Sequence, residues 1–328
     1  MARPDSFFKT ILAAAGNPHM VEGPVATAAH LARRQRARLH IVHAVPLIDA
    51  LGKTGPKSAG NERGTCDDSY AMARCLLGLY TGPFPQLLAD DVEITTGVAW
   101  EAIYRAASEL RCDLIVVGPH KATAPVRSSD GIKGFLGSTA DGVIRRAGCP
   151  VMIVKDELPG DLLGFQRIMV GMDFSASCTA AVCLAALLAH RYGSFVSTFH
   201  MLPIAPYPKY TPRALQADRI RQQKRMNIVC SRLLEGTTHQ LFLKPGVRPH
   251  EELLRFADLN NADVIILGSH TRERAGKWYS GSVVQQVAAR AACPLVVVNG
   301  PAALTPWKDV PFVSRCFPAP PPSPDFPR

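Results

Sequence analysis

The chain has 328 residues, of which 47% are hydrophobic and 20% are charged, and its formal net charge at pH 7 is +10. This composition excludes a wholly disordered chain, and the length predicts two domains at roughly 150 residues each. The longest run of small apolar residues, Ala180 to Ala189, is too short for a membrane span, which needs about 20 residues. Residues 1–10 lack the apolar core of an export signal, and the nine cysteines form no Cys-x-x-Cys pair. We therefore expect a cytoplasmic protein without a disulfide framework or a zinc ribbon.

The first half of the sequence alternates apolar runs with helix-like stretches. Strands are expected over 10–16 and 39–45, separated by a helix that closes on a cluster of arginines, where positive charge complements the helix dipole. Further apolar runs stand at 114–117 and 150–154. Several of these runs are continuous rather than alternating, which is typical of strands buried on both faces of a parallel sheet.

The second half follows the same order. Four apolar runs predict strands, over 167–173, 195–201, 264–267 and 295–298. Thr211–Pro212 predicts the start of a long helix, as an N-cap followed by proline, and Gly236 predicts its end. This helix carries a basic cluster without interleaved aromatic residues, so a solvated helix face is favoured over a nucleic-acid-binding patch. The cluster comprises Arg213, Arg219, Arg221, Lys224 and Arg225.

The two halves repeat each other. The pairs Ile11/Ile168 and His43/His200 have the same separation in sequence, and residues 112–120 match residues 262–270. The offset then falls by six, so the first copy carries a six-residue insertion between His120 and Gly137. A period of this length indicates duplication of a whole domain. The order of elements predicts an α/β fold of two tandem doubly wound domains, each with a five-stranded, mostly parallel sheet.

The domain boundaries follow from this repeat and from proline and glycine. We expect a first domain over 1–156, a linker over 157–164 and a second domain over 165–300. Nine prolines lie in residues 301–328, and this tail is expected to be extended and mostly disordered. The apolar strands at 150–154 and 294–298 would lie at the sheet edges, where bare strands tend to pair.

A ligand of an open parallel sheet binds beyond the carboxyl ends of its strands, at the point where the strand order reverses. In the second half this edge carries Asp173 after the first strand, Met201 after the second, and Gly268 to His270 after the fourth. Gly281–Ser282 opens the last helix, whose unpaired N–H groups suit a phosphate. Ser282 either donates to a phosphate or caps the helix. Asp173 either accepts from a ribose hydroxyl or an exocyclic amine, or it is a turn residue.

At these positions the sequence resembles a tandem universal stress protein, over about residues 8–156 and 165–299. Nucleotide-binding members of that family carry an aspartate after the first strand and a Gly-x2-Gly-x9-Gly-Ser/Thr loop. Here the loop reads Gly268-x2-Thr271-x9-Gly281-Ser282, with the spacing kept and threonine in place of the middle glycine. The resemblance implies a Rossmann-like fold and a stress-response regulatory protein that binds ATP, ADP or AMP in its second domain, with Mg²⁺ accompanying ATP. The implied site comprises Asp173, Met201, Gly268, His270, Thr271, Gly281, Ser282 and Val283.

Alternatives follow from the same residues. The chain could be a scaffold that binds protein partners and no nucleotide, because both copies have lost motif residues. No nucleophile–base pair is evident, so we expect no enzyme, although slow nucleotide hydrolysis through Glu273 stays open. Basic residues in the loop, Arg272, Arg274 and Lys277, either neutralise phosphates or are solvated. No Cys/His set has metal-ligand spacing, and no membrane or nucleic-acid partner is expected.

The first copy departs further from the family pattern. Gly16 stands where the aspartate belongs, and Lys121 replaces the middle glycine. A helix N-terminus contributes only roughly 0.3–1 kcal/mol to anion binding, whereas micromolar affinity needs about 8 kcal/mol. We therefore expect the first domain to be empty and structural. Family members dimerise through the last strand, so the resemblance also implies that the two domains pair as a dimer within one chain; association of two chains stays open.

Overall fold

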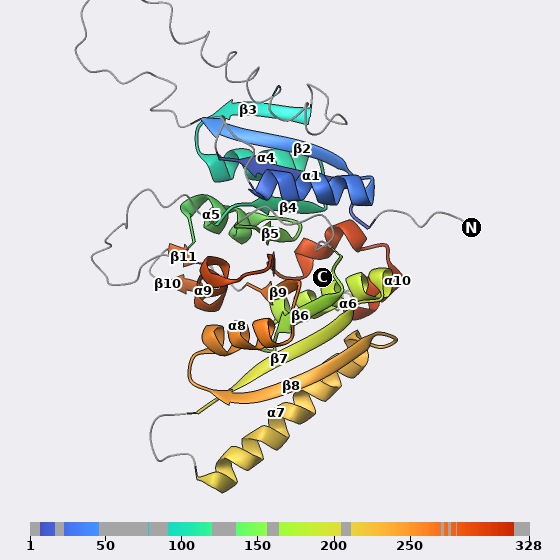
Figure 1. Ribbon diagram of the computed structural model, residues 1–328, viewed down its shortest axis with the longest axis vertical. Coiled ribbons are helices and arrows are strands. Elements are labelled where there is room, and N and C mark those ends of the chain that lie inside the picture. Colours follow the sequence, from blue (N-terminus) through green and yellow to red (C-terminus); the bar gives the residue numbers. More distant parts are fainter. Residues whose placement is uncertain are drawn as a thin grey trace, which may run out of the picture.

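The structure is a computed structural model that describes residues 7–16, 23–45, 78, 91–119, 136–155, 164–204, 211–269, 272–274, 277–279 and 281–317. Its two halves are stacked along the long axis of the molecule (Figure 1). Within the described part of the chain, no helix is long and apolar enough to cross a membrane. Of the expected linker, only Gly164 lies inside the described residues.

The first half alternates strands and helices as the apolar runs predict. Its elements are β1 (Thr10–Ala15), α1 (Gly23–Gln35), β2 (Arg38–Val45), β3 (Val92–Thr96), α4 (Ala99–Glu109), β4 (Leu114–Val117), α5 (Ser138–Arg146) and β5 (Val151–Ile153). Arg33 and Arg34 occupy the last turn of α1, as expected for cations at a helix C-terminus.

The second half repeats this order with longer elements. It contains β6 (Arg167–Gly171), α6 (Ala176–Tyr192), β7 (Phe195–Pro203), α7 (Pro212–Leu233), β8 (Thr238–Gly246), α8 (Pro249–Leu259), β9 (Val264–Gly268), β10 (Arg272–Arg274), β11 (Lys277–Tyr279), α9 (Ser282–Arg290) and β12 (Leu295–Val298). The backbone N–H of Ala214 donates to the Thr211 hydroxyl over 3.2 Å, which confirms the predicted start of α7. The short strands β10 and β11 pair antiparallel within the loop that precedes α9.

All long strands join one ten-stranded sheet, in the order β3-β2-β1-β4-β5-β12-β9-β6-β7-β8. Within each half the strands are parallel, and the order reverses between β1 and β4 and between β6 and β9. The halves meet where β5 and β12 pair antiparallel, with Met152 opposite Val296. The structure therefore confirms two doubly wound domains, and it joins them through the two apolar strands expected at the edges.

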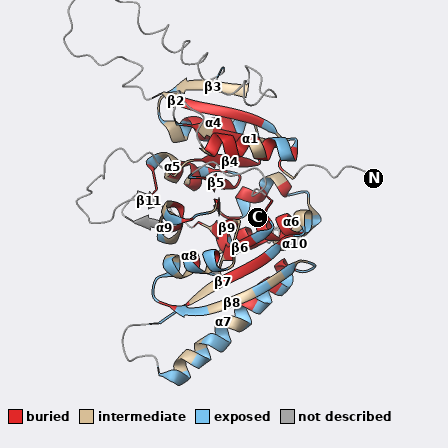
Figure 2. Ribbon diagram, in the orientation of Figure 1, coloured by how far each residue is buried: buried red, intermediate tan, exposed pale blue. Residues whose placement is uncertain are grey.

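Each face of the continuous sheet carries its own core. Ile168 and Val170 of β6 belong to the core on one face, together with residues of α1, α6 and α7, whereas Met169 belongs to the core on the other face, together with residues of α4, α5, α8 and α9. This alternation is the two-residue period of a strand covered on both sides. The buried residues run through both domains in Figure 2, and α6 is buried almost all round. The cores thus extend across the junction of the two halves.

The C-terminal segment corrects the expected disordered tail. Residues 301–307 form the 3₁₀ helix η2 (Pro301–Trp307), and residues 311–316 form α10 (Pro311–Cys316). The Trp307 ring stacks on Phe7 at a centroid distance of 4.8 Å, and its indole N–H donates to the Phe7 carbonyl. Both helices begin with proline, which is compatible with the first helical position. Residues 318–328 lie outside the described residues.

In each domain one aspartate, at the same position of the repeat, binds the backbone at the start of the first strand. Asp113 precedes β4 and accepts from the backbone N–H groups of Lys9 and Thr10. Its counterpart Asp263 precedes β9 and accepts from the backbone N–H groups of Gln166 and Arg167. Each carboxylate therefore ties the first strand of its domain to the fourth. Burial raises the pKa of Asp263.

Candidate functional site at the carboxyl edge of the second domain

The order of strands places Asp173 and Gly268 at the same edge of the sheet. In the second domain the chain turns outward from β6 toward β7 and β8 in one direction, and from β9 toward β12 in the other. Asp173 stands two residues beyond the end of β6, and Gly268 ends the neighbouring strand β9. Gly171 is directly opposite Leu267 in this pair. Asp173 and Gly268 therefore flank the reversal point, which is the usual ligand position in such sheets.

Asp173 has a local role in its own turn. Its Oδ1 atom accepts from the backbone N–H of Ser175 over 2.9 Å, and the Ser175 hydroxyl accepts from the N–H of Cys178 over 3.1 Å, which caps α6. The turn interpretation of Asp173 is therefore confirmed. Asp173 is nevertheless exposed at the sheet edge, and a carboxylate can accept several hydrogen bonds at once.

Three side chains beside Asp173, those of Phe174, Arg225 and His200, stack on one another, which the sequence alone did not predict. Phe174 adopts a left-handed backbone with φ of 64°, which costs a residue with a Cβ about 1–2 kcal/mol. The Arg225 guanidinium lies over the Phe174 ring, 4.1 Å from its centroid, and the His200 imidazole lies 4.8 Å away. One member of the basic cluster on α7 therefore packs against the turn that holds Asp173. The rest of the cluster is exposed, as a solvated helix face predicts.

The histidines that recur in the repeat have a common task. His200 Nδ1 is 2.7 Å from the Met172 carbonyl, and His43 Nδ1 is 2.8 Å from the Ala15 carbonyl in the first domain. Each imidazole thus holds the residue that ends or follows the first strand of its domain. Burial and the neighbouring Arg225 lower the pKa of His200, although the Met172 carbonyl and Asp173 oppose this. The uncharged ring is the expected form near pH 7.

Met201 lies inside β7 rather than after it, because this strand continues to Pro203. Its side chain packs beside Gly246 of β8. The Phe199 carbonyl accepts from the Met172 N–H at the β6 side of the strand. Alternate residues of a strand direct their main-chain groups to the same neighbour, so Met201 directs its N–H and C=O toward the space beyond the end of β6.

The two predicted glycines differ in their surroundings. A Cβ on Gly268 would lie 2.4 Å from backbone atoms of Ser177 and Cys178 in α6, so this glycine permits a close helix–strand contact. At Gly281, which is the N-cap of α9, no described atom lies within 4 Å of a Cβ position, and φ is −54°. Packing therefore explains the glycine at 268, whereas neither packing nor backbone conformation explains the glycine at 281.

The first turn of α9 lacks a side-chain cap within the described part of the molecule. Ser282 is the first helical residue and is exposed, so the interpretation of Ser282 as an N-cap is wrong. Val283 is half-buried against the core. Ser269, which sequence reasoning missed, is only 2% exposed, and its hydroxyl has no hydrogen-bond partner among the described residues. His270, Thr271 and the side chains of residues 272–274 and 277–279 lie outside what the structure describes.

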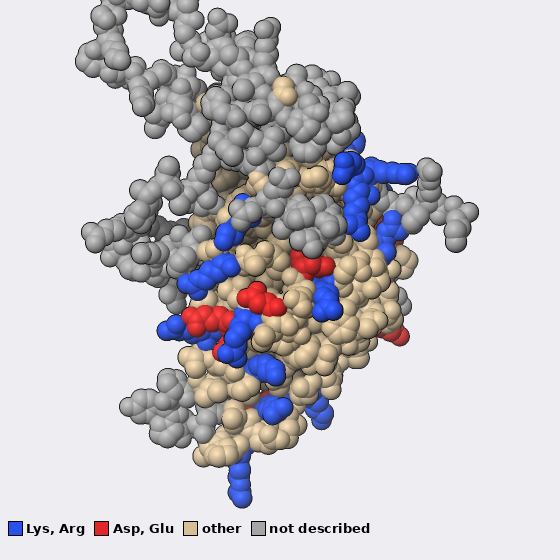
Figure 3. All heavy atoms as spheres, viewed as in Figure 1, with Lys and Arg blue, Asp and Glu red and all other residues tan. Residues whose placement is uncertain are grey.

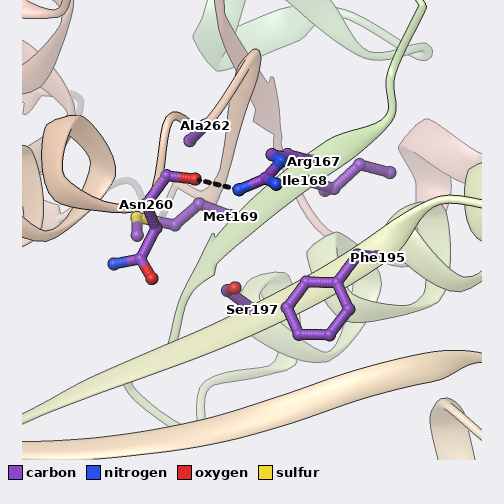
Figure 4. A pocket seen from close by; sticks show the side chains of 7 residues that line it. All are labelled: Arg167, Ile168, Met169, Phe195, Ser197, Asn260 and Ala262. Atoms are coloured by element: carbon purple, nitrogen blue, oxygen red, sulfur yellow. Dashed lines mark hydrogen bonds between the residues drawn. The ribbon is translucent and has the colours of Figure 1, made fainter.

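A small cavity of about 30 Å³ lies at the opposite edge of the same sheet (Figure 4). It is lined by residues at the amino ends of β6 and β7 and before β9: Arg167, Ile168, Met169, Phe195, Ser197, Asn260 and Ala262. The Arg167 guanidinium is held by the Asn260 carbonyl at 3.1 Å. This volume suits ordered water rather than a nucleotide.

Charged side chains of the described residues form no metal centre, and they form no continuous basic surface on the face shown in Figure 3. Groups of three or more metal-ligating side chains are absent from the described residues. On the face shown in Figure 3, lysines and arginines are dispersed, with acidic side chains between several of them. A broad electrostatic footprint for nucleic acid is therefore not seen on that face.

Comparison with known proteins decides the family. The sequence model of the universal stress protein family matches the chain twice, at residues 7–155 and 164–299. The chain belongs to the universal stress protein family. A universal stress protein of Thermus aquaticus is 33% identical over 150 residues, which is 45% of this chain and 99% of that protein.

Solved structures agree with the tandem fold. A universal stress protein from Archaeoglobus fulgidus superposes with a TM-score of 0.59 at 18% identity, covering 88% of this chain and 97% of that one. A protein of unknown function from Pseudomonas aeruginosa gives 0.58 at 16% identity, covering 95% and 96%. Because both matches cover most of this chain and nearly all of the solved chain, the likeness of fold extends over both halves.

Proposed function

We propose that the second domain of this universal stress protein binds an adenine nucleotide and thereby serves a regulatory role in the stress response. The main support is the position of two elements on either side of the reversal point. One is the turn that carries the exposed carboxylate of Asp173. The other is β9, from which the chain leads to the first turn of α9, where no described side chain caps the helix. A carboxylate suits a ribose hydroxyl, and free N–H groups at a helix N-terminus suit phosphate. ATP is the favoured ligand, with ADP and AMP as alternatives.

The three parts of the nucleotide would meet different elements. The adenine would lie against the main chain of Met201, and the ribose against Asp173. The phosphates would approach Gly281, Ser282 and the N–H of Val283; that no described atom lies within 4 Å of a Cβ position at Gly281 supports a close contact. Ser269 would gain a partner for its buried hydroxyl, which is costly to leave unpaired. Gly268 positions β9 against α6, and His270 and Thr271 complete the proposed loop.

Mg²⁺, when ATP is bound, would be carried mainly by phosphate oxygens, since Mg²⁺ is usually held by one or two carboxylates together with substrate phosphates. In the family, a universal stress protein from Archaeoglobus fulgidus has been solved in complex with dAMP. For the first domain we propose no ligand, because Gly16 supplies no carboxylate at the position of Asp173.

The nucleotide proposal predicts a melting shift that depends on Asp173. ATP at about 100 times its Kd should stabilise the wild-type chain by about 2.7 kcal/mol, or roughly 5–10 °C in Tm. Loss of a hydrogen bond to a charged group costs about 1.5–3 kcal/mol, so Asp173→Ala should remove most of the shift at the same ATP concentration. Differential scanning fluorimetry with and without ATP measures this directly.

The comparison uses the ligand-dependent shift, because Asp173→Ala also removes the hydrogen bond to Ser175 and lowers the basal Tm. Asp258→Ala is the matched control, since Asp258 is an exposed aspartate near the C-terminal end of α8. The control should keep the full shift. An equal shift in Asp173→Ala and wild type would contradict the proposed ribose contact.

A scaffold function without nucleotide is the second candidate. It is favoured by the finding that Gly268 is required by helix packing and that Asp173 is required by its own turn. Both residues therefore have reasons to be present without a ligand. This candidate predicts that ATP, ADP and AMP leave the Tm of the wild-type chain unchanged.

A further inference from the structure

The C-terminal segment fastens onto helix α6 and onto the start of the chain. Trp307 of η2 stacks on Phe7, which precedes β1 and also contacts Tyr192 at the end of α6. In α10, the Phe312 ring meets His190 of α6 edge-on at 5.8 Å. Residues 301–317 therefore cover a seam to which both domains contribute aromatic side chains. The segment therefore adds contacts between the two domains beside the β5–β12 strand pair.

Two free thiols face each other where the segment meets α6. Cys183 is in the middle of α6 and is fully buried, and Cys316 is the last residue of α10 and is half-buried. Their side chains are hydrogen-bonded to each other and belong to the same apolar cluster. The two thiols are therefore in contact before any covalent bond forms.

The other described cysteines lack this combination of a facing thiol and access from solvent. Cys230 is buried, and its sulfur is 3.8 Å from the Met172 sulfur and 3.8 Å from the Thr198 hydroxyl. Cys112 and Cys149 are both buried in the first domain. Cys293 is half-buried, and the charged groups near it are Asp263 and Asp258 rather than another described cysteine. Cys183 and Cys316 are therefore the described pair with one thiol that an oxidant can reach.

We propose that Cys183 and Cys316 are a redox modification site, at which a reversible disulfide locks the C-terminal segment onto the second domain. The geometric requirement is small, because facing thiols have only to close from hydrogen-bond distance to an S–S bond of about 2.05 Å. The short helix α10 lies near the end of the described chain, so it can make this adjustment without moving the sheet.

A hydroperoxide is the oxidant class that balances the reaction. The Cys316 sulfur attacks one peroxide oxygen, the O–O bond breaks, and Cys316 becomes a sulfenic acid while water or an alcohol leaves. The Cys183 sulfur then attacks the Cys316 sulfur, the S–S bond forms, and the S–O bond breaks. The departing hydroxide takes the Cys183 proton and leaves as water. A dithiol reductant reverses the reaction through a mixed disulfide.

Thiol acidity sets the order and the pace of these steps. The Cys316 neighbour and burial both raise the pKa of Cys183 above its usual range, so this thiol stays protonated near pH 7. The more accessible Cys316 is therefore the first to meet the oxidant. Cys183 reacts second, within the fold, where its proximity offsets its low thiolate fraction. The bond should form faster at pH 9 than at pH 7.

The test is mass spectrometry of the full chain after oxidation. Folded protein is treated with hydrogen peroxide, free thiols are blocked with N-ethylmaleimide, and the chain is digested with trypsin without reduction. We expect the peptide 168–191 to be linked to the peptide 316–328, with fragmentation placing the bond at Cys183 rather than at Cys178. Oxidised protein should melt roughly 5 °C or more above reduced protein, because the bond closes a long loop in the unfolded chain.

Two variants make the result decisive. Cys316→Ser changes the half-buried thiol and is expected to fold, to lose the linked peptides and to lose the rise in Tm. Cys293→Ser, the control with a half-buried thiol elsewhere, should keep both. Recovery of both wild-type peptides in blocked form after oxidation, or a bond at Cys178, would overturn the proposal. So would a peroxide-induced rise in Tm that persists in Cys316→Ser.

Discussion

Replacing Gly268 by alanine is expected to destabilise the second domain by about 3 kcal/mol or more. The new Cβ would lie 2.4 Å from the backbone N of Cys178 and 2.4 Å from the backbone carbon of Ser177. These are main-chain atoms at the start of α6, so no side-chain rotation relieves the clash. Either β9 or α6 must move, and α6 is buried almost all round. Urea unfolding followed by circular dichroism measures the loss as a lower midpoint.

The first domain supplies the matched control. Gly118 is the counterpart of Gly268 in the repeat. Among the described atoms, a Cβ there would meet only the Pro24 side chain, at an ordinary contact distance of 3.5 Å. Gly118→Ala should therefore change stability by less than about 1 kcal/mol. Equal effects of the two substitutions would show that β9 and α6 are not packed as closely as the structure has them.

Trp307→Ala is expected to cost about 3–5 kcal/mol, which is the usual range for removing a large buried aromatic side chain. Trp307 is only 7% exposed, and its ring lies against both Phe7 and Phe8. Because Phe7 precedes the first strand and η2 follows the last, the substitution should weaken a contact between the two ends of the described chain. Chemical unfolding followed by far-UV circular dichroism, which reports on the backbone rather than on tryptophan, measures the loss of stability.

Tyr104→Ala is the control for this substitution. Tyr104 is also an aromatic residue, but it is 40% exposed on α4, so its removal should cost less than about 1 kcal/mol. A Trp307→Ala midpoint equal to that of the wild type would mean that residues 301–317 do not pack on the domains. The tail would then behave as its proline content alone predicts.

Most of the fold could be predicted, because the burial of an element determines which of its residues are apolar. Continuous apolar runs such as Val264–Leu267 mark strands covered on both faces, and the duplication fixes the order of elements twice. The apolar strands at 150–154 and 294–298 indicated sheet edges that tend to pair, whereas the antiparallel direction of the β5–β12 pair is a finding of the structure. The Thr211–Pro212 pair predicted the first residue of α7 correctly.

The tail could not be predicted, because its proline content obscured a weaker pattern. Ala303, Leu304 and Trp307 are spaced as one face of a short helix, and all three are buried. Two prolines stand at helix starts, where they are tolerated, rather than inside an extended chain. The proline content describes the segment as a whole. It does not reveal the few apolar side chains that pack against the two domains.

Only part of the candidate site could be predicted from the sequence. Asp173 and Gly268 follow or end neighbouring strands, and topology places the ends of parallel strands together. The stacking of Arg225 on Phe174 joins residues on different elements, which no local pattern reveals. The buried hydroxyl of Ser269 escaped notice for the same reason. The reason for the glycine at 268 depends on how close α6 approaches, which is a property of packing.

Isothermal titration of ATP into the full chain tests the central claim most directly, because it counts sites as well as detecting them. We predict saturable binding with one nucleotide per chain, since the second domain has Asp173 and the first has Gly16 at the matching position. Two equivalent nucleotides per chain, or no binding heat at several temperatures with ATP, ADP or AMP, with or without Mg²⁺, would contradict a single nucleotide site in the second domain.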